Sequence, residues 1–194
     1  MRLLTHTAFG LFLGTVFYYL FNLDVGFILL TGFAAFLPDV DWIMEFSWGF
    51  GSVHRKLLHN VWFLTILTLL VLFLFREFIL VLAVIVGFTS HLLIDSFTVT
   101  GVYWLYPIRK YHLKGPFSMS RVESKSIEKY LQTAFFTSSG LIFLAKQIPL
   151  SGVFSYEGII LIGALLIVGY YLFKVFGKVL ERIIRSLFST VERV

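Results

Sequence analysis

The chain has 194 residues, of which 58% are hydrophobic, 19% are aromatic and only 14% are charged. Soluble domains carry about 25% charged residues, so this composition excludes an ordinary soluble protein and predicts a polytopic membrane protein. The absence of cysteine excludes a disulfide framework and thiolate ligands, so any metal must be bound by histidine, carboxylate or water. The net charge of +5 comes from basic residues that flank apolar runs, which is typical of membrane orientation, and no nucleic-acid partner is expected.

About six apolar segments follow one another and predict an all-α fold, a polytopic membrane helix bundle that forms one integral membrane domain over residues 1–194. The second segment is shorter than the about 20 residues that a span normally needs, and it stops at Pro38. Together with the residues up to 107, the first four segments form the half of the chain that carries recognisable motifs. They are expected at residues 3–21, 25–37, 57–75 and 78–97.

The second half of the chain is more basic. Residues 108–130 combine several lysines and arginines with glycine and proline, which is typical of an interfacial loop. Two further spans are expected within residues 131–173, and the Ser-Ser-Gly cluster at residues 138–140 favours close helix contact in the first of them. In residues 174–194, basic residues recur at helical spacing beside an apolar face, which predicts an amphipathic helix against anionic lipid headgroups. Its basic residues include Lys174, Lys178, Arg182 and Arg185.

A pair of ionisable residues, His91 and Asp95, lies near the end of the fourth apolar segment. Four residues apart on a helix, they share a face, and Thr98 follows about one turn further on. Ionisable residues in a membrane segment are costly unless they are paired or bound, so the pair is a candidate functional site. The alternative is a His–Asp hydrogen bond that only locks two helices, and Thr98 either orients a ligand or simply ends the helix.

The distribution of charge predicts which ends of the segments meet. With six spans, most lysines and arginines lie on the side of both termini, which the positive-inside rule places in the cytoplasm. Candidate metal ligands lie at the same ends of four spans, and among the histidines and aspartates only His112 and Asp24 are left out. This segregation favours one shared site over scattered structural residues. The candidate ligands are His6, Asp39, Asp41, His54, His59, His91 and Asp95.

Seven candidate ligands exceed the four that a tetrahedral zinc takes. The surplus favours either two divalent ions or one ion with outer carboxylates that orient the histidines. An imidazole-rich set favours zinc or manganese over magnesium or calcium. Asp39 and Asp41 lie two residues apart, so both face one site only if their segment is extended or if one of them is an outer ligand.

Arg55 adds a candidate substrate contact. Arg55 and His59 are four residues apart and share a face if the segment is helical, which would place a guanidinium beside the metal, where it could clamp a phosphate. The alternative is that Arg55 only fixes the orientation of the chain in the membrane. His54 is expected just before the third helix and His59 in its first turns. The residues expected to act in catalysis are Asp41, Arg55 and Asp95.

Four separated motifs occur in the first half of the chain: Thr5-His6, Leu37-Pro-Asp-Val-Asp41, His54-Arg-Lys-Leu-Leu-His59, and His91 through Asp95 to Thr98, Gly101 and Pro107. In this order they resemble the YdjM-type family of membrane-bound metal-dependent hydrolases. The resemblance implies a multi-spanning hydrolase whose metal is held by these His and Asp residues. Family members usually read His-Arg-x-x-Thr-His, whereas here Leu58 precedes the second histidine, which removes a hydroxyl and keeps the proposed ligands.

These features lead us to expect a metal-dependent hydrolase in the cell membrane, with both termini cytoplasmic. A metal-activated water would attack an amphiphilic substrate such as a lipid phosphoester, and the basic segments would hold anionic headgroups nearby. The main alternative is a divalent-metal or proton transporter, which predicts acidic residues at mid-membrane depth and on the far side, where the chain has few. A scaffold protein with a structural metal would bind the ion without turnover.

Overall fold

The computed structural model describes residues 3–40, 58–98, 101–108 and 121–147, with isolated helical positions between residues 156 and 177. Within residues 121–127 it describes the backbone alone. The regular elements in these ranges are all helical, as the sequence predicts. They are α1 (Leu3–Phe21), α2 (Val25–Phe36), the short 3₁₀ helix η1 (Leu37–Asp39), α4 (Val61–Phe75), α5 (Phe78–Ser96) and α6 (Arg121–Gln147).

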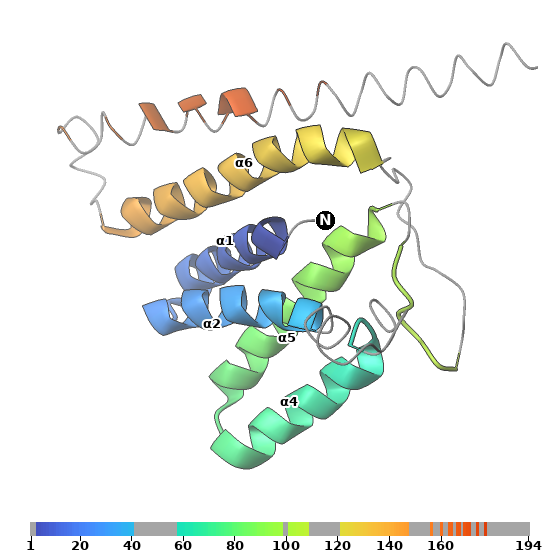
Figure 1. Ribbon diagram of the computed structural model, residues 1–194. Helices are drawn as coiled ribbons and strands as arrows, with labels where there is room; N and C mark the ends of the chain where they lie inside the picture. Colours follow the sequence, from blue (N-terminus) through green and yellow to red (C-terminus); the bar gives the residue numbers. More distant parts are fainter. Residues whose placement is uncertain are drawn as a thin grey trace, which may run out of the picture.

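The helices pack around α1, α2 and α5 (Figure 1). The helices α1 and α2 lie side by side, α5 packs against both of them, and α6 runs along α1. The helix α4 packs against α5. The ends of α1, α2, α4 and α5 that carry the candidate ligands are thereby brought to one end of the bundle.

The helix ends follow local sequence signals. The helix α2 passes into η1, which contains Pro38, because proline lacks the N–H that an α-helix would need there. The helix α4 begins at Val61, since Asn60 is its N-cap and the Phe63 N–H donates to Asn60 Oδ1 over 2.8 Å. The predicted start of this helix at residue 57 is therefore wrong. His59 precedes the cap and does not lie in the first turns of the helix.

The helix α6 corrects two further predictions. It begins at Arg121, so the residues from there to 130 are helical and do not belong to a loop. A helix that packs on one side only can carry charged residues on its other faces, so the apolar run does not mark its start. The Ser-Ser-Gly cluster makes no close helix contact in the described residues, because a Cβ added at Gly140 would meet nothing within 4 Å.

Close helix contact occurs instead where glycines of α1 and α5 face α2. A Cβ added at Gly10 would lie 2.5 Å from Ala35 Cβ. A Cβ added at Gly87 would lie 2.7 Å from Ala34 Cβ and would clash with the carbonyl oxygen of Thr31. Small residues that let backbones approach in this way are the usual basis of helix association in membranes.

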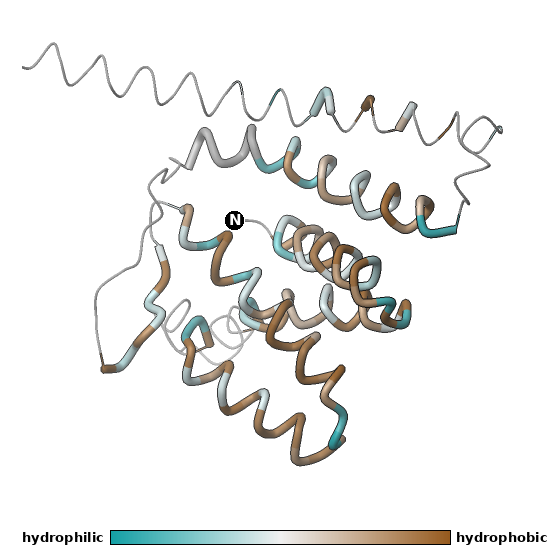
Figure 2. Tube along the Cα trace, turned by 180° about the vertical axis from the view of Figure 1, so that it is seen from behind, coloured by the Kyte–Doolittle hydropathy of each residue, from teal (hydrophilic) through white to brown (hydrophobic). Residues whose placement is uncertain are grey.

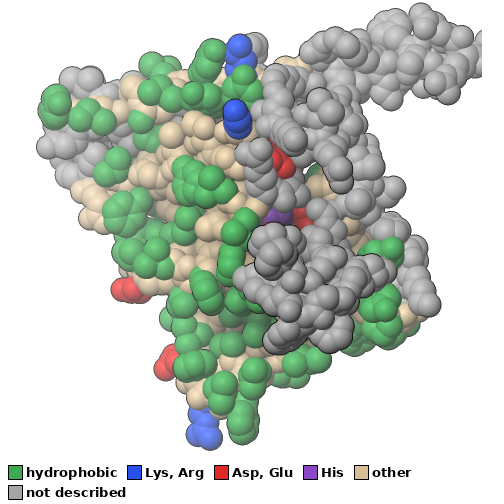
Figure 3. All heavy atoms as spheres, in the orientation of Figure 1, with side chains coloured by type: hydrophobic (Ala, Val, Ile, Leu, Met, Phe, Trp, Pro, Cys, Tyr) green, Lys and Arg blue, Asp and Glu red, His purple; other side chains and the backbone are tan. Residues whose placement is uncertain are grey.

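The exterior of the described helices is apolar. Hydrophobic positions run along α1, α2, α4 and α5 (Figure 2), and hydrophobic side chains are spread over the visible described surface, where few charged side chains appear (Figure 3). The helix α4 has no buried residue, and Phe73 and Phe78 are 77% and 78% exposed. By length and composition, α1 and α5 are able to cross a membrane, whereas Val25–Asp39 and Val61–Phe75 are shorter apolar helices. An apolar exterior of this extent is expected of a bundle surrounded by lipid.

The contact between α2 and α5 yields a testable prediction. The substitution Gly87→Ala should destabilise the protein by about 1–3 kcal/mol, because the added methyl group forces the two backbones apart. Gly140→Ala is the matched control, since its methyl group meets open space. Thermal unfolding of the purified proteins in detergent measures both effects. Equal stability of the two variants would show that the α2 and α5 backbones are not in close contact.

Candidate metal centre

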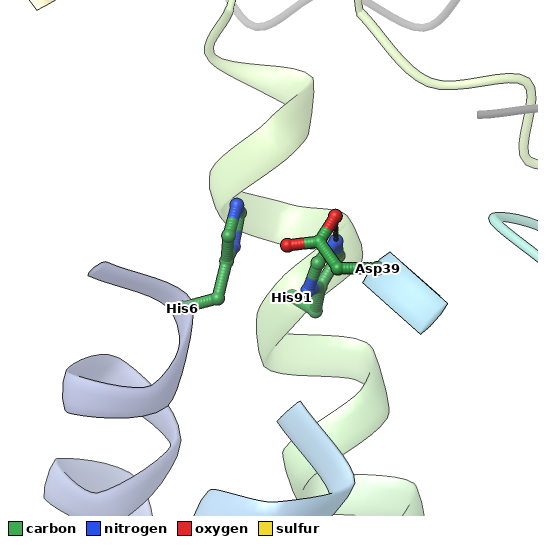
Figure 4. A group of neighbouring side chains, drawn as sticks. All are labelled: His6, Asp39 and His91. Atoms are coloured by element: carbon green, nitrogen blue, oxygen red, sulfur yellow. Dashed lines mark ion pairs between the residues drawn. The ribbon is translucent and has the colours of Figure 1, made fainter. Parts of the chain in front are cut away.

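Five ionisable side chains from four segments meet at one end of the bundle. His6 lies in the first turns of α1, Asp39 ends η1, and His59 directly precedes the N-cap of α4. His91 and Asp95 lie four residues apart near the end of α5. All three histidines are fully buried, Asp95 is 1% exposed, and the Asp39 side chain is 17% exposed. Figure 4 shows His6, Asp39 and His91 pointing toward one another from three different elements.

Four of these residues present ligand atoms at the spacing of a coordination shell. His59 Nε2 lies 3.0 Å from His91 Nε2, and both nitrogens lie 3.6 Å from Asp39 Oδ1. The same two nitrogens lie 3.7 and 3.8 Å from Asp95 Oδ2. Two nitrogens bound to one tetrahedral zinc at about 2.05 Å would be about 3.3 Å apart. Two overlapping groups of three residues therefore bring ligand atoms close enough to hold a divalent cation: His59, His91 and Asp95, and His6, Asp39 and His91.

The orientation of His91 is fixed by the backbone of α2. His91 Nδ1 lies 2.8 Å from the carbonyl oxygen of Ala35, which can only accept a hydrogen bond, so Nδ1 carries the proton and donates it. Nε2 is then left with a lone pair that faces His59 and the carboxylates. Metal-binding histidines usually donate their second ring nitrogen to a carbonyl or carboxylate in this way. Because only Nε2 is available, His91 can bind one ion and cannot bridge two.

His6 occupies a different place in the cluster. Its ring stacks on that of His91, with 3.8 Å between the ring centroids and 20° between the planes. His6 Nε2 lies 3.2 Å from Asp95 Oδ1, the oxygen that does not face His59 and His91. Within the described residues, neither ring nitrogen of His6 makes a hydrogen bond. A fully buried imidazole with both nitrogens unsatisfied is costly, and a bound cation or an outer contact through Asp95 would satisfy it.

Hydrogen bonds from the residues that follow α5 connect this helix to the start of α4. Trp104 Nε1 donates to Ser96 Oγ over 2.9 Å, and the Val61 N–H donates to the carbonyl oxygen of Trp104 over 2.9 Å. These bonds connect the end of α5, which carries Asp95, to the residues next to His59. Thr98 Oγ1 donates to the carbonyl oxygen of Asp95 over 2.7 Å, which favours a helix-end role for Thr98 over a ligand-orienting one.

Three predicted site residues, Asp41, His54 and Arg55, lie outside the described residues. Their predicted roles therefore stay predictions. The sequence analysis also missed two contacts that the structure contains. The carbonyl of Ala35 has no signature in the residue type, and Gln132 lies in the half of the chain without a motif, where its Nε2 donates to Thr5 Oγ1.

The fold and this cluster define the class of protein: an α-helical membrane protein with a buried His/Asp cluster where the ends of several helices meet. The chain belongs to the YdjM inner membrane protein family, whose family model matches residues 1–180. No curated protein and no solved structure matches the chain. The family membership and the apolar helices α1 and α5 place the protein in a membrane.

The N-cap of α4 directly follows His59, and its contribution to the stability of the helix start can be tested. Asn60→Ala should lower the stability of the protein by about 1 kcal/mol, because it removes the side-chain acceptor for the Phe63 N–H. Asn60→Ser keeps a capping oxygen and should lose much less. Thermal unfolding in detergent compares the two variants with the wild type. If the alanine and serine variants were equally stable, the cap would have no part in holding the start of α4.

Proposed function

We propose that the protein is a membrane-embedded metal-dependent hydrolase. The observation that carries the proposal is a buried pair of histidine nitrogens, His59 Nε2 and His91 Nε2, 3.0 Å apart and each 3.6–3.8 Å from an oxygen of Asp39 and of Asp95. The cation would be zinc or manganese, which suit a mixed set of imidazole and carboxylate ligands. When bound, it would activate a water molecule and polarise the substrate oxygen.

The site could hold one ion or two, depending on the roles of Asp95 and His6. Four protein ligands close a tetrahedral zinc site, whereas a catalytic zinc keeps one position open. An ion with five or six ligands would retain space for water beside the four atoms. Alternatively, Asp95 would bridge two ions, with Oδ2 facing His59 and His91 and Oδ1 facing His6. Both versions give Asp95 a catalytic role, because its carboxylate would bind and orient the metal ion or ions.

The substrate class follows from the location of the cluster. It lies at the ends of apolar helices, where a membrane lipid exposes its headgroup. We propose that the substrate is amphiphilic, with a lipid phosphoester as the leading candidate. Asp41 and Arg55 would complete the site, the first as a ligand or general base and the second as a clamp for the phosphate. The basic residues of 108–130 and of the tail at 174–194 would attract anionic headgroups.

The proposed topology has six spans with both termini in the cytoplasm, so that the cluster faces the cytoplasmic interface. The fifth span would lie within α6, which begins at Arg121, and the sixth would be a later segment, of which the described positions between residues 156 and 177 are helical. The helices α2 and α4 would cross as shorter spans, which a local thinning of the bilayer accommodates. This topology supports a hydrolase that receives its substrate from the inner leaflet.

A transporter is the rival proposal, because chains of His and Asp also mark ion pathways. In the described residues, the buried histidines and Asp95 gather at one end of the bundle. The buried polar residues deeper in α1 and α2 are Thr15 and Thr31, whose hydroxyls donate to carbonyls of their own helices. Hydroxyls bonded in this way do not relay ions, so this arrangement favours a site at the interface over a path across the membrane.

The proposal predicts metal-dependent turnover of a phospholipid. Purified protein in mixed micelles should release a phosphorylated product from an anionic phospholipid, and a chelator should abolish the release. Asp95→Ala should lower the rate by at least about 100-fold, since it removes a ligand and leaves His6 without its carboxylate. Phosphorus NMR of the micelles measures the product.

Asp24→Ser is the matched control, because Asp24 is an aspartate outside the cluster whose Oδ1 caps α2 and serine keeps a capping oxygen. Its rate should equal that of the wild type. Full turnover by Asp95→Ala would refute the proposed site. Metal flux into liposomes without phospholipid turnover would instead favour the transporter.

A further inference from the structure

The helix α6 comes from the half of the chain without a family motif, yet it contacts α1 at both ends of their interface. At one end of this interface, Gln132 Nε2 donates to Thr5 Oγ1 over 2.8 Å. Near the end of α6, Lys146 Nζ donates to the Tyr18 carbonyl oxygen over 3.0 Å, and Gln147 Nε2 lies 3.5 Å from the Tyr18 hydroxyl. The two helices therefore run parallel (Figure 1). Because Thr5 directly precedes His6, the Gln132 contact lies at the same end as the His/Asp cluster.

The Gln132 contact lies beside a candidate ligand. Thr5 and His6 are consecutive, and both are fully buried. Side chains of consecutive helical residues point about 100° apart, so α1 can direct Thr5 at α6 while it directs His6 at α5. The first turn of a helix has N–H groups without helical partners and frays readily unless side chains hold it. The bond between Gln132 and Thr5 fixes the rotation and the depth of this turn.

The His6 ring contacts other members of the cluster: its Nε2 lies 3.2 Å from Asp95 Oδ1, and the ring stacks on His91. Within the described residues both of its ring nitrogens lack a hydrogen-bond partner, in contrast to His91, whose Nδ1 is held by the Ala35 carbonyl. The position of His6 against the His91 ring and Asp95 Oδ1 therefore depends on where α1 is placed. That placement is what the contact with α6 supplies.

We infer that Gln132 is a positioning residue for the metal centre: acting through Thr5, it holds His6 in place, so that α6 completes a site whose ligands all come from the first half of the chain. The inference rests on the proposed metal-binding function. It gives a role to the half of the chain in which the sequence shows no motif.

The test is the affinity of the full-length protein for zinc, measured in detergent by competition with a chromophoric chelator. Gln132→Ala should weaken zinc binding about tenfold, the low end of the loss that follows removal of a ligand's outer contact, because Gln132 acts on His6 only through Thr5. Gln147→Ala is the matched control, because it removes a glutamine contact between the same two helices at the opposite end. Its affinity should stay within about twofold of the wild type. Thr5→Val removes the same bond from the side of α1 and should reproduce the loss of Gln132→Ala.

A double-mutant cycle separates positioning of His6 from a general loss of stability. If Gln132 acts through His6, adding Gln132→Ala to His6→Ala should weaken zinc binding no further. An additional tenfold loss in that background, or wild-type affinity in Gln132→Ala, would overturn the inference while leaving the metal centre intact. Failure of the wild-type protein to bind zinc or manganese would instead overturn the proposed function itself.

Discussion

Burial of ionisable groups in an apolar bundle is the constraint on which the structure depends. Asp95 and three histidines are almost completely buried, and a second carboxylate, Asp39, lies within 3.6 Å of two of those histidines. Two carboxylates that face the same two histidines, in surroundings of low dielectric constant, repel one another unless positive charge lies between them. A divalent cation would balance the two negative charges and leave the histidines neutral. The proposed metal thus accounts for a cluster that would otherwise destabilise the fold.

Close backbone contacts between the helices also position the residues of this cluster. Glycines allow α2 to approach α1 and α5 closely, and Gly87 lies one turn before His91 on α5. The same approach brings the carbonyl of Ala35 to His91 Nδ1, which sets the tautomer that leaves Nε2 facing the cluster. The close approach of α2 and α5 therefore both packs the two helices and orients His91. A methyl group at residue 87 would disturb both.

Much of this arrangement could be predicted from the sequence, because apolar length and charge asymmetry fix the order of helices in a membrane. The bounds of α1 were predicted correctly and those of α5 within one residue, and the five described ligand candidates meet, as the distribution of charge suggested. The contact of the Ala35 carbonyl could not be predicted, since a backbone group has no residue-type signal. The start of α4 was misplaced because Leu57 and Leu58 extend the apolar run beyond the Asn60 cap. The role of Gln132 depends on a contact 127 residues apart in the chain, which no local pattern contains.

The most direct test of the account is the metal content of the purified protein, compared between the wild type and a His91→Ala/Asp95→Ala variant. Elemental analysis of the wild type should find about one or two zinc or manganese ions per chain, depending on whether Asp95 bridges. The double variant should lose them together, because it removes the ligand fixed by α2 and the carboxylate shared with His6. A well-folded wild type without metal after supplementation, or equal metal in both proteins, would contradict the account.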